Sequence, residues 1–286
     1  MSKSSSPLRY PGGKSCLLPL VSNLLKINSL RHRSYAEPYA GGCGLALSLL
    51  YASFVSEIHV NDIDASIWSF WYSVLSETEE LCERINTAEM SIDEWRRQKE
   101  VYSSQDVSDP VSLGFATFYL NRTNRSGIIK DAGVIGGLNQ TGNYKMDCRF
   151  NKDDLERRIR RVAKYKRRIH LYRLDALEFI KESQKITPEK TFFCIDPPYY
   201  KKGSSLYTSF YKPDDHALLA KTVLDLEKPW IVTYDNTPEI QELYNHMRQY
   251  SFDVNYSVQT KRVGNELLIA SENLNVPSEL ERRKVA

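Results

Sequence analysis

The 286-residue sequence predicts an α/β fold with a Rossmann-like, doubly wound sheet and a mainly helical insertion. The first predicted strand, Ser34–Glu37, leads into a glycine-rich turn, and a helical pattern follows at Leu45–Tyr51. The next strand-like run, Ile58–Asn61, is followed directly by Asp62. This order of strand, glycine turn, helix, strand and acid is typical of the start of a doubly wound α/β sheet.

The middle of the chain has a different character. Glu79–Gln98 is charged and helical in pattern, whereas Val111–Asn121 is more apolar and is predicted to pack beneath it. Gly127–Tyr144 is rich in glycine, a composition typical of a hairpin or an extended loop. We therefore predict an inserted domain at residues 77–168.

Strand-like apolar runs return after this segment, at Ile169–Leu174, Thr191–Ile195, Trp230–Tyr234 and Glu266–Ala270. Their return predicts that the two ends of the chain build one sheet. The predicted α/β domain therefore comprises residues 1–76 and 169–275, and residues 77–168 interrupt it.

Composition is ordinary for a globular protein, with 41% hydrophobic and 26% charged residues. No apolar stretch is long enough to cross a bilayer, and the polar start of the chain, Met1–Ser6, argues against a secretory signal. The five cysteines are scattered without a C-x-x-C pair, which argues against a disulfide framework and a structural zinc site. These features predict a cytoplasmic protein with reduced thiols and no membrane attachment.

Positive charge is concentrated in one region. Between Asn121 and His170 there are 14 Lys and Arg residues against 5 Asp and Glu, although the net charge of the whole chain is only +3. A basic region on an otherwise acidic protein is expected where a polyanion docks. The equally weighted alternative is the solvated face of an amphipathic helix at Leu155–Arg168.

The strongest chemical signal is Asp196-Pro197-Pro198-Tyr199, directly after the apolar run Thr191–Ile195. Ligands bind beyond the carboxyl ends of strands in an open α/β sheet, so chemistry is expected at this loop. The prolines fix the backbone, so that the Asp196 carboxylate and the Pro197 carbonyl can face one amine while Tyr199 stacks on a ring. The loop predicts binding of an exocyclic amine on a heteroaromatic ring; the alternative is a proline-rich turn with a buried tyrosine.

A second motif, Glu37–Gly44, has the sequence EPYAGGCG. Its glycines allow the backbone to approach a ligand closely at a helix N-terminus. Asp62 follows at an offset of about 20 residues, where an acid binds ribose hydroxyls in nucleotide-binding α/β folds. A plain loop is the alternative for the glycines, and a helix N-cap is the alternative for Asp62.

The third motif is the turn Arg9–Lys14, with the sequence RYPGGK. A tight Pro-Gly-Gly turn that presents an aromatic ring and a lysine suits a ligand with both a carboxylate and a cationic group. In isolation such a turn is commonplace.

The order RYPGGK, EPYAGGCG, NDID, a long insertion and DPPY resembles the Dam-type, D12 class DNA adenine-N6 methyltransferases. Further matching segments are Phe118–Ile128, Leu206–His216, Trp230–Asn236 and Glu266–Ala270. The resemblance covers most of the chain. It implies a Rossmann-like methyltransferase sheet, an inserted target-recognition domain and S-adenosylmethionine as cofactor.

The resemblance also implies roles for individual residues. The target adenine would be gripped by Asp196, Pro197 and Tyr199. S-adenosylmethionine would be bound by Tyr10, Lys14, Glu37, Gly41, Asp62, Asp175 and Asp196. DNA would be contacted by Arg122, Asn124, Arg125, Ser126, Lys130, Lys145 and Arg149. GATC specificity is not implied, because Arg125 and Lys130 stand where GATC-specific members carry an aromatic residue and an arginine.

The predicted reaction is site-specific methyl transfer to N6 of an adenine that flips out of double-stranded DNA. Transfer would be a direct displacement aided by positioning and by the Asp196 carboxylate, with no covalent intermediate and no metal. His170 and His216 lack partners at metal-ligand spacing and are predicted to be turn or surface residues.

Three alternatives remain open at this point. The first is a methyltransferase acting on adenine N6 in RNA or on cytosine N4. The second is a catalytically weak DNA-recognition subunit of a restriction or defence system; a cognate restriction endonuclease or a defence-system protein is also a candidate partner for the enzyme. The third, a dinucleotide-dependent oxidoreductase, is disfavoured because the G-x-G-x-x-G fingerprint is absent.

Overall fold

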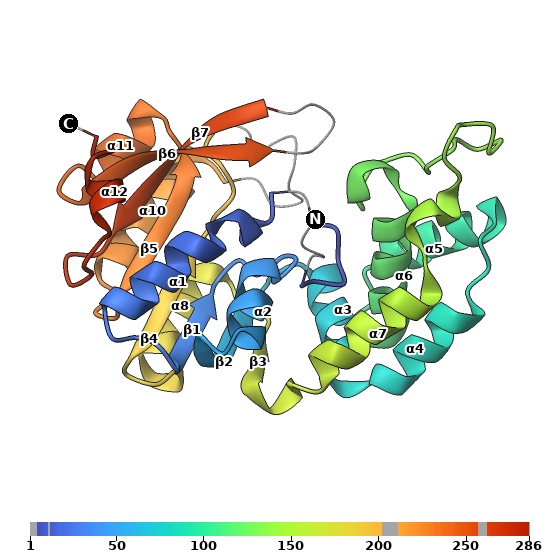
Figure 1. The fold of residues 1–286 in the computed structure, drawn as a ribbon. Coiled ribbons are helices and arrows are strands. Elements are labelled where there is room, and N and C mark those ends of the chain that lie inside the picture. The colour runs from blue at the N-terminus through green and yellow to red at the C-terminus, as the bar shows by residue number, and fades with distance from the viewer. Residues whose placement is uncertain (1–4, 11, 202–210, 257–261, 286) are drawn as a thin grey trace. The chain divides into compact units, whose positions relative to one another are not determined.

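The computed structural model describes residues 5–10, 12–201, 211–256 and 262–285 (Figure 1). Its strands form a seven-stranded sheet in the order β3-β2-β1-β4-β5-β7-β6. Their bounds are β1 Arg33–Glu37, β2 Val55–Asn61, β3 Ile169–Tyr172, β4 Thr191–Ile195, β5 Trp230–Asp235, β6 Arg248–Tyr256 and β7 Arg262–Ala270. Strand β1 runs parallel to β2 and β4, and β4 runs parallel to β5, whereas β7 is antiparallel to β5 and β6. This mostly parallel sheet with flanking helices confirms the predicted α/β, Rossmann-like class.

The helices are distributed along the whole chain. Their bounds are α1 Leu18–Ile27, α2 Gly44–Tyr51, α3 Ala65–Ser76, α4 Thr78–Thr87, α5 Ile92–Ser104, α6 Pro110–Thr123, α7 Lys152–Ala163, α8 Ala176–Ile186, α10 Pro213–Leu224, α11 Pro238–Leu243 and α12 Ser278–Glu281. Short 3₁₀ turns are η1 Lys14–Leu17, η2 Arg125–Gly127, η3 Met146–Arg149 and η4 Lys166–Arg168. Among the described residues, none of the helices has the length and apolar character required to cross a bilayer.

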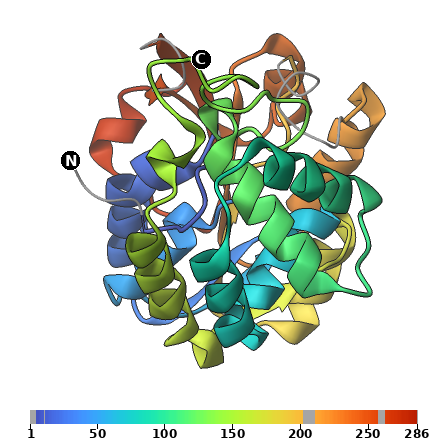
Figure 2. The same ribbon diagram turned by 90° about the vertical axis from the view of Figure 1, so that its right-hand side faces the viewer.

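The chain divides into two compact units. The first comprises Met1–Gly13, Gly41–Gly44 and Asp62–Arg173. The second comprises Lys14–Ala40, Leu45–Asn61 and Leu174–Ala286. The first unit therefore contains helices α3 to α7 (Figure 2, cyan to yellow-green), and the second contains most of the sheet strands.

Helix α6 is the buried element of the first unit. All but two of its residues are buried, so the predicted packing of the apolar segment beneath charged helices is confirmed. Phe118 of α6 stacks on Phe70 of α3 with ring centroids 5.4 Å apart, and Phe150 packs edge-on against Phe118. Side-chain caps begin the surrounding helices, as at Asp64 before α3 and Ser91 before α5.

Helix α7 explains part of the local positive charge. Leu155, Ile159 and Val162 form its buried stripe. On its other face Arg160 pairs with Glu156 on the same helix and with Glu79, which leaves this arginine already neutralised. For α7 the structure thus favours the alternative of a solvated, ion-paired helix face.

The second unit places its functional loops at one edge of the sheet. Strands β4 and β5 are buried along their whole length, as expected of central strands with both faces covered. Two acids of this unit lie where neighbouring strands end: Glu37 ends β1 and Asp196 follows β4. The carboxyl edge of the sheet, where α/β folds bind ligands, therefore carries these two carboxyl groups.

Candidate active site

Asp196 begins the loop that follows β4. Its Oδ1 accepts a hydrogen bond from Thr233 Oγ1 on β5 at 2.8 Å and lies 3.3 Å from the ammonium of Lys14. About 19% of the side chain stays exposed. Burial raises the pKa of the carboxyl group, while Lys14 and Thr233 oppose that rise. Asp196 is therefore a fixed carboxylate that keeps some access for a ligand.

Tyr199 ends the same motif and is held by its hydroxyl. Lys14 donates a hydrogen bond to the Tyr199 hydroxyl oxygen, and the hydroxyl in turn donates to Glu266 of β7. Only 5% of Tyr199 is exposed, and the Lys14 ammonium lies 4.7 Å from the centre of the ring. The buried tyrosine of the alternative interpretation is thus observed, while stacking of a base on the ring stays a prediction.

The glycine-rich turn is packed against Tyr10. A Cβ added to Gly41 would lie 2.7 Å from the Tyr10 ring, and one added to Gly42 would lie 2.5 Å from the Tyr10 Cβ. Gly41 also has a φ of +46°, and its carbonyl accepts a hydrogen bond from Trp71 Nε1 at 2.8 Å. Glycine is required at these positions for close approach and, at Gly41, for the backbone conformation. A plain surface loop does not need this packing.

Asp62 holds the glycine turn from the other side. Its carboxylate accepts the backbone amides of Gly41 at 2.8 Å and Asp64 at 3.0 Å. Burial raises the pKa of Asp62 to about 7, although these two hydrogen bonds act to lower it. The helix N-cap is Asp64, which accepts the amides of Ser66 and Ile67, so the N-cap alternative for Asp62 is wrong.

Asn61, which the sequence patterns did not single out, connects two of the loops. Its side-chain amide donates to the carbonyls of Pro38 and Leu174, both at 3.0 Å, and its Oδ1 accepts the Leu174 amide at 2.9 Å. The neighbouring Asp175 is exposed and caps α8 by accepting the amide of Leu177. A buried asparagine at the end of a strand was the available signal, because such a side chain needs several hydrogen-bond partners.

A family model of D12 class N6 adenine-specific DNA methyltransferases matches residues 10–258. The chain belongs to this family. It is therefore an enzyme of the DNA adenine methyltransferase class. A search of curated proteins returned no match.

The methyltransferase carries a second buried acid at Glu37. The Tyr35 hydroxyl donates to Glu37 at 2.8 Å, yet burial raises the pKa of Glu37 to about 8. The folded state therefore binds this proton more tightly than the unfolded chain, where the pKa of glutamate is about 4.3. Stability from this group is fully present below the unfolded pKa and is lost as pH rises toward about 8.

We therefore expect Glu37→Gln to become relatively more stable as pH rises. Glutamine stays neutral, so the free energy of unfolding of the variant should gain a few kcal/mol relative to wild type between pH 5 and pH 8. Urea unfolding of both proteins across this range measures the difference. The other buried acids are present in both proteins, so their contributions cancel in the difference between the two free energies of unfolding. If the free energies of unfolding of the two proteins changed in parallel with pH, the raised pKa of Glu37 would be contradicted.

Asn124 organises the segment predicted to contact DNA. It is buried, accepts a hydrogen bond from Trp95 Nε1 at 2.7 Å, and donates to the carbonyls of Ile128 at 3.0 Å and Ile129 at 3.1 Å. This network is internal to the first unit and shapes the loop after α6. Of the residues in this loop that are predicted to contact DNA, Arg125 and Lys130 are exposed, and Ser126 is half-buried with a φ of +57°.

Arg122 differs from the other arginines predicted to contact DNA. It is only 7% exposed and donates to the carbonyl of Pro7, whereas Arg149 and Lys145 are exposed. Burial, together with nearby arginines, lowers the pKa of Arg122 to about 9. The structure thus gives Arg122 an internal role in holding the N-terminal segment against α6.

These positions predict different salt dependence for two matched variants. Arg149→Met should reduce the magnitude of the slope of log K for DNA binding against log salt concentration by about one, because the variant would lack one predicted phosphate contact. Arg122→Met should leave that slope unchanged, since its guanidinium is buried. Titrations of labelled duplex DNA at several salt concentrations measure both slopes. If the magnitude of the slope fell by one unit in the Arg122 variant as well, this side chain would be shown to reach the phosphates.

One of the two histidines predicted as turn or surface residues differs from its predicted position. His216 lies in α10 and is buried, with Nδ1 2.9 Å from the Tyr234 hydroxyl, so its prediction as a turn or surface residue is wrong. The hydrogen bond to Tyr234 of β5 satisfies Nδ1 of the ring, whereas the buried Nε2 has no hydrogen-bond partner among the described residues. His170 lies on β3 and is half-buried. Residues 206–210 of the matching segment Leu206–His216 lie outside the described residues.

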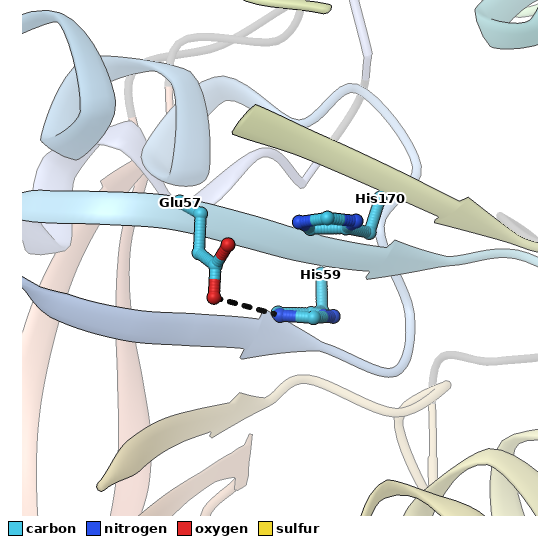
Figure 3. Close-up of side chains that lie close together, drawn as sticks. All are labelled: Glu57, His59 and His170. Carbon is cyan, nitrogen blue, oxygen red and sulfur yellow. Dashed lines mark ion pairs between the residues drawn. The ribbon is translucent and has the colours of Figure 1, made fainter. Parts of the chain in front are cut away.

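A third histidine, His59, lies beside an acid on β2. His59 Nε2 lies 3.5 Å from Glu57 Oε1 (Figure 3). The Glu57 carboxylate also accepts a hydrogen bond from Ser34 Oγ on β1 at 2.7 Å. The hydrogen bond from Ser34 to Glu57 therefore links the two parallel strands.

Proposed function

We propose that this enzyme transfers a methyl group from S-adenosylmethionine to N6 of a flipped-out adenine in double-stranded DNA. The observation that carries the proposal is the geometry of Asp196. Its carboxylate is fixed by Thr233 and Lys14 and is still partly exposed, at the edge of the sheet where ligands bind. Family membership supplies the reaction class.

The residues at the carboxyl edge fit the proposed cofactor. S-adenosylmethionine supplies an electrophilic methyl group on a sulfonium when it is bound. The glycine turn offers close backbone approach, and the acids beyond the strands can accept hydrogen bonds from hydroxyl and amino groups. The proposed cofactor-binding residues are Tyr10, Lys14, Glu37, Gly41, Asp62, Asp175 and Asp196.

The chemistry assigned to the loop is positioning and charge stabilisation. The Asp196 carboxylate and the Pro197 carbonyl would accept hydrogen bonds from the adenine amine, which directs its lone pair toward the methyl group. The cofactor would supply the methyl group to N6 and leave as a neutral thioether, and N6 would release one proton to solvent. The Asp196 carboxylate stabilises the positive charge that develops on N6. Stacking on Tyr199 would hold the flipped base.

Target recognition is proposed for residues 77–168, inserted into a catalytic domain of residues 1–76 and 169–275. Exposed cations of the insertion, such as Lys145 and Arg149, would contact phosphates, and Arg125, Ser126 and Lys130 would read bases. We propose that the enzyme acts in the cytoplasm. A cognate restriction endonuclease or a defence-system protein is its candidate partner.

The test is transfer of labelled methyl from S-adenosylmethionine to unmethylated genomic DNA, with structured RNA as a parallel substrate. Digestion to nucleosides identifies the labelled base. We expect N6-methyladenine in DNA from wild type and none from Asp196→Ala. Label in RNA alone, or at cytosine N4, would overturn the proposal.

A further inference from the structure

Two acids lie directly opposite each other in the sheet. Asp235 of β5 pairs in register with Glu266 of the antiparallel strand β7. Residues in such a pair point to the same face of the sheet. Both are buried, with 7% of Asp235 and 1% of Glu266 exposed. Like charges in this arrangement destabilise a sheet, and burial adds to the cost, so each carboxyl group requires compensating partners.

Those partners are three consecutive residues of the loop after β4. The two carboxylate oxygens of Asp235 accept the backbone amides of Tyr200 at 2.8 Å and Lys201 at 2.9 Å. The Glu266 carboxylate accepts the hydroxyl of Tyr199. The like-charged pair therefore holds the end of the DPPY loop through both its backbone and its side chain.

Glu266 also determines where Lys14 lies. The ammonium of Lys14 is 3.3 Å from Glu266 Oε2 and 3.3 Å from Asp196 Oδ1, so it bridges two carboxylates. Glu266 thus acts on both ends of the DPPY motif, on Tyr199 directly and on Asp196 through Lys14. A residue whose only role was to stabilise the strand would not need these contacts, because an apolar side chain would serve better in a buried sheet position.

We propose that Glu266 is a positioning residue for methyl transfer and that it forms, with Asp235, a carboxylate clamp on residues 199–201. The clamp holds Tyr199 and Lys14 in place and thereby orients Asp196 toward the target amine. This role rests on the proposed methyl transfer and extends it to residues outside the DPPY motif.

The test compares Glu266→Gln with a matched control, Glu281→Gln. Glu281 accepts a hydrogen bond from Tyr250 at 2.8 Å, so its variant breaks a tyrosine–glutamate contact of the same kind away from the loop. We expect Glu266→Gln to lower kcat by on the order of 100-fold with little change in KM for DNA, because the reacting groups are misplaced. The control should stay within about twofold of wild type. An unchanged kcat in Glu266→Gln, or an equal loss in Glu281→Gln, would overturn the proposal.

A second measurement does not require activity. If Glu266 acts through the Tyr199 hydroxyl, the shift in Tm caused by Glu266→Gln should shrink by about half when Tyr199 is already phenylalanine. Tyr199→Phe keeps the ring and so remains usable if the Glu266 variant folds poorly, and it should also lower kcat. Additive Tm shifts would reject the clamp. Absence of methyl transfer by wild type would reject the proposed function, but the comparison of Tm shifts would still test the clamp.

Discussion

Asp196→Asn is expected to lower kcat for methyl transfer to DNA by roughly 100- to 1,000-fold, the loss typical when a charge-stabilising group is removed from an active site. Asparagine keeps the shape and can still accept from Thr233 Oγ1, but it removes the negative charge next to Lys14. Single-turnover transfer at saturating DNA isolates this step from product release. Cofactor affinity and Tm measured on the same preparations show that the variant is folded.

The pH dependence of the wild-type rate supplies an independent check on Asp196. Burial raises the pKa of its carboxyl group above the ordinary value for aspartate. Since the proposed role requires the carboxylate, kcat should fall as pH decreases through this raised pKa. The fall should occur at higher pH than for an exposed aspartate, and Asp196→Asn should lack it. A rate that stays constant down to pH 4 would contradict the role of the carboxylate.

Those parts of the candidate active site that depend on local pattern could be predicted from the sequence. The apolar run Thr191–Ile195 followed by two prolines identified both the strand β4 and its loop, because burial and φ restriction are encoded in adjacent residues. The spacing of Asp62 from the glycine turn singled out a residue whose carboxylate holds that turn, while its role in ribose binding stays a prediction. These features need no knowledge of which strands lie side by side.

The contacts across strands could not be predicted in the same way. Asp235 and Glu266 are about thirty residues apart, and only the antiparallel register of β5 and β7 brings them together. Both residues lie in segments that resemble the family, Trp230–Asn236 and Glu266–Ala270, but nothing in either segment indicates that the two acids pair. Arg122 posed the opposite problem: its basic side chain suggested DNA contact, while its place on the buried helix α6 gives it an internal hydrogen bond.

Gly41→Ala is expected to destabilise the protein by about 2–4 kcal/mol through two separate effects. A left-handed backbone at φ +46° costs a non-glycine residue about 1 kcal/mol, and overpacking adds about 1–3 kcal/mol. The added Cβ would lie 2.7 Å from Cε1 and 2.9 Å from Cζ of Tyr10, which are both ring atoms. Because the turn is also the proposed cofactor site, affinity for S-adenosylmethionine should fall as well.

Tyr10→Ala distinguishes the two glycines. Removing the ring should relieve the overpacking part of Gly41→Ala and leave only the backbone cost of about 1 kcal/mol. It should give no such relief to Gly42→Ala, whose Cβ would lie 2.5 Å from the Tyr10 Cβ, an atom that alanine retains. Urea unfolding of wild type, the three single variants and the two double variants measures both interaction energies. If Tyr10→Ala reduced the destabilisation of both glycine variants, or of neither, Tyr10 would not pack on the turn as the structure describes.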